Sequence, residues 1–254
     1  MIYDLQKASL LKRFSAFLLD FILLCVLTSG FAFLLAWITR IDSYTATIQA
    51  YYEQYEEKYG VDFEISAEDY ANLSQEEKDL YQEAYSAIFL ENPEAARAYK
   101  MSVALPILIT TISIFLSYVV FEFIVPLFLK NGQTVGKKVF GLGVVFNNSV
   151  RITNFALFVR GVLGKYTIET MFPVALIMLV IYQQMGILAL ILVAALFLLQ
   201  LVLLIATKNK TFIHDILANT VVVDIQSQMI FDSTQALISY KEELSKQESE
   251  KKEY

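Results

Sequence analysis

Hydrophobic residues are gathered in a few long runs along the chain, and most charged residues lie in the segments between these runs. The charged segments are the first dozen residues, residues 40–100 and the tail after Asp224. The runs between them are long enough to cross a hydrocarbon core of about 30 Å, which requires about 20 helical residues. The pattern therefore predicts an all-α integral membrane protein in contact with the lipid bilayer.

About four of these runs are predicted to be transmembrane helices. The first, residues 14–38, contains a single charged residue, Asp20, and the second, residues 102–129, contains only Glu122. The run at residues 186–207 contains no charged residue and is the clearest of the set.

The third predicted span is less obvious, because the apolar run at residues 170–182 would be only about 20 Å long as a helix. Extending it to residues 168–187 gives a spanning length and includes Glu169, Gln183 and Gln184. The distribution of positive charge supports this extension, since three spans would leave the basic residues after the last span on the wrong side of the membrane.

The orientation follows from the excess of lysine and arginine on the cytoplasmic side of membrane proteins. Such residues dominate before the first span, between the second and third spans, and after the fourth. They are Lys7, Lys12, Arg13, Lys130, Lys137, Lys138, Arg151, Arg160, Lys165, Lys208 and Lys210. Because residues 40–100 contain more acids than bases, we expect them outside a cell membrane that has both chain termini on its cytoplasmic side.

The insert between the first two spans is expected to fold into a small helical unit. Tyrosines recur at intervals of three and four residues over residues 43–59, and Ser66-x-x-Asp69 and Ser74-x-x-Glu77 are patterns that begin helices. The predicted organisation is the N-terminus and first span at 1–39, the insert at 40–100, the second span at 101–129, a cytoplasmic loop with a glycine motif and an amphipathic helix at 130–167, the third span at 168–187, the fourth at 188–207, a His-Asp motif at 208–224 and a charged tail at 225–254.

Composition removes several classes of function. The 254 residues are 56% hydrophobic, with a mean hydropathy of +0.51. The single cysteine, Cys25, cannot form an internal disulfide, and the single histidine, His214, excludes a histidine-rich zinc site. We therefore expect no enzymatic activity or catalytic residue, no bound metal and no cofactor. The net charge of −6 is the sum over segments on the two sides of the membrane, which differ in their charge. It gives no reason to expect a nucleic-acid partner.

Two acids interrupt the apolar runs at matching positions. Asp20 lies seven residues after Arg13, and Glu122 lies seven residues before the predicted end of its span. Since the two helices run in opposite directions, both carboxylates are expected about 10 Å inside the cytoplasmic leaflet. They could pair with Arg13, Arg160 or a lysine of the loop after the second span and lock the helices together, or share a site that carries a proton or a small cation.

The loop after the second span contains the glycine motif Gly132-Gln133-Thr134-Val135-Gly136-Lys137. A nucleotide-binding P-loop follows a strand and has four residues between its glycines. This motif has three residues between them and follows a membrane helix, so nucleotide binding is excluded. Further along, residues 144–146 and 149–152 are predicted to form a β-hairpin, to which residues 220–223 could add a third strand.

Two further segments are predicted at the cytoplasmic surface. Residues 155–168, which include Arg160 and Lys165, form an amphipathic pattern that could rest in the membrane interface. After the fourth span, His214-Asp215 could act as a proton relay, because histidine titrates near neutral pH. A structural anchor is the favoured interpretation.

Together these motifs resemble the RDD family of membrane proteins, which is named for one arginine and two aspartates. The matching positions are Arg13, Asp20 and Asp215, together with the motifs at 132–137 and 214–220. Gly143 and Asn219 depart from the family pattern. The resemblance implies a multi-pass membrane protein, and some members of the family are linked to ion or solute transport, including cation/proton exchange, while others resemble regulators of membrane enzymes.

We expect transport of a small ion or solute through a buried charge cluster on the cytoplasmic side, in which Asp20 and Glu122 carry the charge. The members of this cluster are Arg13, Asp20, Glu122, Arg160, His214 and Asp215. Four helices alone form only a narrow pathway, so a homodimer could serve this role. The alternative is a non-transporting adaptor or regulator, whose insert or tail binds another membrane protein.

Overall fold

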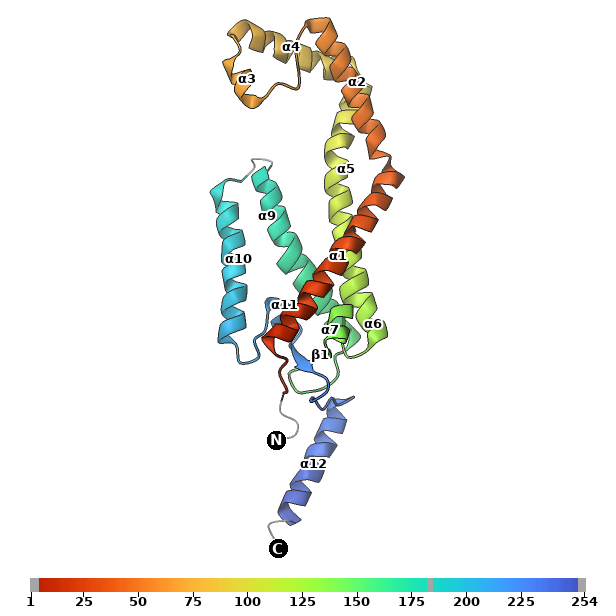
Figure 1. The fold of residues 1–254 in the computed structure, drawn as a ribbon, viewed down its shortest axis with the longest axis vertical. Helices are drawn as coiled ribbons and strands as arrows, with labels where there is room; N and C mark the ends of the chain where they lie inside the picture. The colour runs from red at the N-terminus through yellow and green to blue at the C-terminus, as the bar shows by residue number, and fades with distance from the viewer. Residues whose placement is uncertain (1–4, 182–184, 251–254) are drawn as a thin grey trace. The chain divides into compact units, whose positions relative to one another are not determined.

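The computed structural model of the protein describes residues 5–181 and 185–250. Within these residues four helices are long and apolar enough to cross a membrane (Figure 1). They are α1 (Leu10–Thr39); α5 (Pro93–Tyr118), continued by η1 (Val119–Ile124) and α6 (Val125–Leu129); α8 (Asn154–Phe158), continued by η2 (Val159–Met171) and α9 (Phe172–Ile181); and α10 (Ile187–Ala206). The prediction of a mainly helical protein with four apolar spans is therefore confirmed.

The third span begins earlier than predicted. Its helix is continuous from Asn154 to Ile181, so the stretch at 155–168 and the predicted third span form one helix. Arg160 and Lys165, which were predicted on an amphipathic stretch at the membrane interface, are both paired with acids inside the protein. The predicted extension through residues 182–184 lies outside the described residues.

The second and third spans each contain a wide π-helical segment, in which backbone hydrogen bonds join residue i to residue i+5. These segments, η1 and η2, pack against each other through Gly161, where a Cβ would lie 2.8 Å from the carbonyl oxygen of Glu122. On another side of η2, a Cβ at Gly164 would lie 2.6 Å from the Cβ of His214. The two glycines therefore let η2 approach two neighbouring segments closely.

A two-stranded antiparallel sheet joins distant parts of the chain. Strand β1 (Leu142–Phe146) pairs with β2 (Thr220–Asp224) in a register that places Val144 opposite Val222. The predicted hairpin is present in part, as an isolated antiparallel bridge between Val145 and Arg151, and the predicted additional strand, β2, is the partner of β1 in the sheet. Both strands are almost completely buried and their β-branched side chains pack together.

The chain divides into two compact units, residues 1–27 with 115–254 and residues 28–114. The second unit contains α2 (Ile41–Tyr59), α3 (Ala67–Asn72) and α4 (Gln75–Glu91). Its core combines Ile88 with the tyrosine face of α2, and the Tyr52 and Tyr85 rings stack at a centroid distance of 6.3 Å. The Ser74–Glu77 capping box is present with both of its hydrogen bonds.

In the first unit, two short helices and the sheet gather at the end where α1 begins (Figure 1). The short helices are α7 (Val135–Val139) and α11 (Ile213–Leu217). The tail forms α12 (Thr234–Glu250), which is anchored by Leu237 against Val150 and Phe231.

Candidate functional site

The first candidate site is built where the glycine motif meets α1. Thr134 is the N-cap residue of α7, and its hydroxyl donates to Asp20 Oδ2 at 2.5 Å. The backbone N–H of Gly136 donates to Asp20 Oδ1 at 2.7 Å. A Cβ at Gly136 would overlap the carbonyl oxygen of Ala16, so this close approach requires glycine. The motif therefore docks the N-terminus of α7 onto a carboxylate of the first span.

Lys137 connects the two acids that interrupt the apolar runs. Its Nζ donates to Thr134 Oγ1 at 3.1 Å and lies 3.9 Å from Asp20 Oδ2. Burial and the nearby Lys165 ammonium lower the pKa of Lys137 to about 8, against the opposing effect of Glu122 and Asp20. Both carboxylates thus act on one buried ammonium, and Glu122 forms its own ion pair with Lys165. We call Asp20, Glu122, Thr134, Lys137 and Lys165 the lysine cluster.

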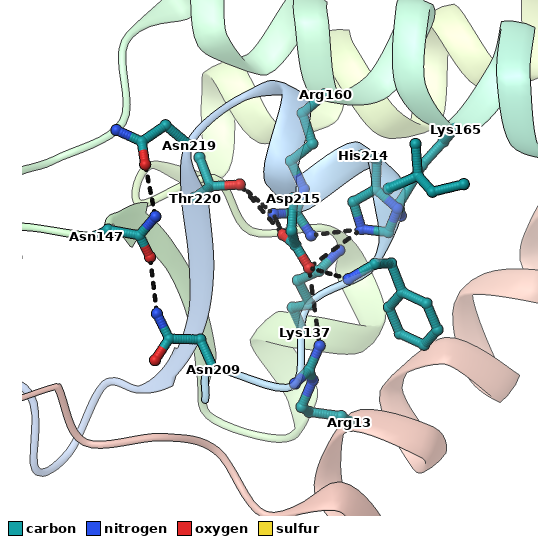
Figure 2. Close-up of polar contacts among 12 residues, drawn as sticks. Arg13, Lys137, Asn147, Arg160, Lys165, Asn209, His214, Asp215, Asn219 and Thr220 are labelled. Atoms are coloured by element: carbon teal, nitrogen blue, oxygen red, sulfur yellow. Dashed lines mark hydrogen bonds and ion pairs between the residues drawn. The ribbon is translucent and has the colours of Figure 1, made fainter. Parts of the chain in front are cut away.

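The second candidate site centres on Asp215, which is completely buried (Figure 2). One of its carboxylate oxygens accepts from Arg160 and from the hydroxyl of Thr220 at 3.1 Å. The other oxygen lies 3.8 Å from Arg13 NH2. Burial would raise the pKa of Asp215, but the positive charge of Arg160 is the largest of the opposing effects that lower it, to about 2. The carboxylate is therefore ionised at any physiological pH.

His214 is held between Arg160 and Glu169 by both of its ring nitrogens. Nδ1 lies 2.8 Å from Glu169 Oε2, and Nε2 lies 3.1 Å from Arg160 NH2. The backbone N–H of His214 also donates to Glu169 Oε1 at 3.0 Å. Burial is the main cause that lowers the pKa of His214. We call Arg13, Arg160, Glu169, His214, Asp215 and Thr220 the histidine cluster.

Each cluster contains the same kind of contact between a short helix and a membrane span. A backbone N–H group at the start of the short helix donates to a carboxylate of the span, which is Asp20 for α7 and Glu169 for α11. In α11 a second side chain from a span contributes, since the N–H of Ile213 donates to Gln200 Oε1 at 3.3 Å. These polar side chains of the spans therefore satisfy helix-terminal N–H groups that would otherwise lack partners.

The structure places all six residues of the predicted charge cluster in these two groups. Asp20 and Glu122 belong to the lysine cluster, whereas Arg13, Arg160, His214 and Asp215 belong to the histidine cluster. The five predicted site residues of the glycine motif have different roles. Thr134, Gly136 and Lys137 contact Asp20, while Gln133 donates to the carbonyl of Leu142 and Gly132 adopts φ +60 in the turn.

Three members of the clusters, Lys165, Glu169 and Thr220, are not among the predicted site residues. The sequence places Glu169 at the start of the extended third span, Lys165 on the amphipathic stretch and Thr220 in a predicted strand. A charged residue inside an apolar run is a recognised indication of a functional or paired position, and Glu169 carried this signal. A lysine partner for Glu122 was among the predicted alternatives, but which lysine pairs with it depends on how η1 and η2 are wound.

Comparison with known proteins gives one match. The family model described as the RDD family matches residues 7–219, which cover most of the chain and nearly all of both clusters. No curated protein and no solved structure matches the chain.

Proposed function

The chain belongs to the RDD family, and from this premise we propose that it is a multi-pass transporter which exchanges a small cation for a proton at the lysine cluster. We further propose that it resides in the cell membrane, that its N-terminus and α12 are cytoplasmic and that it works as a homodimer. No enzymatic reaction is part of this proposal.

The observation that carries the proposal is the sharing of one buried lysine by two carboxylates. With a pKa of about 8, the Lys137 ammonium can release its proton close to neutral pH. When it does so, Asp20 and Glu122 lose a positive charge that they share. A monovalent cation that enters in its place restores the charge, so that proton and cation compete for the same position.

The oxygen atoms around Lys137 suit such a cation. Asp20 supplies a carboxylate and Thr134 a hydroxyl, and both lie within 4 Å of Lys137 Nζ. Hard cations prefer oxygen ligands of this kind to nitrogen or sulfur ligands. Na⁺ is therefore the probe of choice.

The test uses the full chain reconstituted in vesicles that contain a pH-sensitive dye and start with an acidic interior. We expect external Na⁺ to drive proton efflux, with a rate that rises between pH 7 and pH 9 as Lys137 loses its proton. Asp20→Asn is expected to reduce this flux at least about tenfold, whereas Lys138→Ala, a change at the exposed neighbouring lysine, leaves it intact. Equal flux in wild type and Asp20→Asn would overturn the proposal.

A second candidate, an adaptor without transport, is favoured by a different observation. Residues 28–114 form a compact unit with its own buried core, which a membrane transporter of four spans does not need. An adaptor would bind its partner with equal strength in wild type and Asp20→Asn, and would show no Na⁺-driven proton flux. The vesicle assay therefore separates the two functions.

A further inference from the structure

The state of the His214 imidazole follows from its two neighbours on η2. Arg160 is always protonated and can only donate hydrogen bonds, so Nε2 of His214 must be the acceptor in their contact at 3.1 Å. Nδ1 then carries the hydrogen and donates to Glu169, 2.8 Å away. The contacts therefore select the neutral Nδ1–H tautomer.

Within the described residues, the charged groups around this imidazole are those of the histidine cluster. Arg160 and Glu169 come from η2, Asp215 comes from α11 itself, and Arg13 of α1 faces Asp215 on its other side. The two arginines balance the two acids. A second proton on the imidazole would consequently add one positive charge to a neutral, buried group.

The position of that second proton is defined by geometry. It can bind only the lone pair of Nε2, which now accepts from Arg160. Once protonated, Nε2 becomes a donor and has an acceptor nearby, because Asp215 Oδ2 lies 3.5 Å away. The Arg160 NH2 group simultaneously loses its acceptor on the ring and faces a like charge.

We propose that His214 and Glu169 form a proton-binding site of their own, separate from the lysine cluster, and that proton uptake at Nε2 detaches Arg160 from the imidazole. No covalent bond other than N–H is formed, and the proton comes from water. Glu169 is the positioning residue, since it fixes the tautomer that leaves Nε2 free to take the proton.

Arg160 couples this site electrostatically to the lysine cluster. Its charge also acts on the buried ammonium of Lys137, whose pKa it helps to lower. A change in the position of Arg160 therefore alters the proton affinity of Lys137 without any direct contact between His214 and that cluster. Acidification at the histidine cluster would in this way adjust the pH range in which the lysine cluster exchanges protons.

The test exploits the fact that His214 is the only histidine in the sequence. The full chain is produced with ¹⁵N-labelled histidine and a histidine-free affinity tag, and is placed in lipid nanodiscs, so that NMR detects one imidazole. We expect a protonated Nδ1 and an unprotonated Nε2 at pH 8, and protonation of Nε2 on acidification with a midpoint below 6.5, the ordinary value. An Nε2–H tautomer, or no second proton down to pH 4.5, would overturn the inference.

Three variants separate positioning from a purely structural role. Glu169→Gln keeps an acceptor for Nδ1–H but removes the charge, so the tautomer should persist while the midpoint falls by roughly one pH unit. Glu169→Leu removes the acceptor and should give a mixture of tautomers. Asp224→Asn, which changes a half-buried acid paired with Lys12, should leave the imidazole signals unchanged. An unchanged midpoint in Glu169→Gln would contradict the role of Glu169.

The inference stands apart from the proposed transport, because the NMR titration needs no flux. A normal titration without Na⁺-driven proton flux would reject the transport proposal alone. Flux without a second proton on His214 would reject this inference alone.

Discussion

Asp20 and Thr134 are joined by a hydrogen bond of 2.5 Å, in which the Thr134 hydroxyl donates to a carboxylate in the middle of an apolar helix. The same hydroxyl accepts from the backbone N–H of Lys137 at 3.4 Å and from its Nζ at 3.1 Å. One small side chain thus caps α7, orients its lysine and satisfies a buried acid of the first span. This explains why threonine, and not only a small residue, stands in the glycine motif.

The Thr134→Val variant tests this arrangement, since valine keeps the shape and removes the hydroxyl. Asp20 loses a donor and α7 loses its cap, so we expect a loss of roughly 1–3 kcal/mol of stability. Thermal unfolding in detergent measures this loss. Thr134→Ser retains the hydroxyl and should lose much less, and equal losses in the two variants would contradict the explanation.

Gly136→Ala tests the close approach of α7 to α1. The added Cβ would overlap the carbonyl of Ala16 and lie 2.7 Å from Asp20 Oδ1, so the backbone must move and roughly 1–3 kcal/mol of stability should be lost. Gly30→Ala is the matched control, because that glycine lies in α1 with open space around it. There, alanine should stabilise the helix by up to about 1 kcal/mol. A stable Gly136→Ala protein with an intact Asp20 contact would disprove the required approach.

The pH dependence of stability tests Lys137. Its pKa is about 8 in the folded protein and 10.5 ordinarily, so between these values the unfolded chain binds more protons than the folded one. Stability should therefore rise with pH across this window, by on the order of 3 kcal/mol for this group alone. Unfolding midpoints from pH 7.5 to 10.5 should show a smaller rise in Lys137→Met than in wild type, while Lys138→Met should follow wild type.

Arg160→Met tests the histidine cluster by leaving the completely buried Asp215 with Arg13 as its remaining basic partner, 3.8 Å away. Removing one partner of a buried ion pair typically costs 3–5 kcal/mol, roughly, because a buried charge is left without compensation. The double variant Arg160→Met/Asp215→Asn should recover part of this loss. Additive losses in the double-mutant cycle would show that the two residues do not depend on each other.

Much of the fold could be predicted from the sequence, and the failures have one physical origin. The spans were found because long apolar runs are a local property of the chain. The shared contact of Arg160 and Glu169 with His214 was not predicted, because nine residues separate these two residues of η2. That separation is about two and a half turns of an α-helix, which puts the two residues on opposite faces. In a π-helix it is about two turns, which brings them to one face.

The sheet was predicted in part. Asn147-Asn148 favours a local hairpin, and the structure keeps one contact across it, the antiparallel bridge between Val145 and Arg151. The longer pairing joins β1 to β2, more than seventy residues away, and is stabilised by burial of valines from both strands, which the local pattern does not report. Most members of the candidate site were predicted, but its division into two clusters was not.

The position of β2 has a consequence for how the protein is made. One edge of this strand pairs with β1, and its other edge bridges to Lys7, near the start of the chain. During synthesis the first span emerges early, but the strand that joins its preceding residues to β1 follows α10 in the chain and emerges after it. Residues 5–8 must therefore wait until all four apolar helices have been synthesised before they acquire their partners in this sheet.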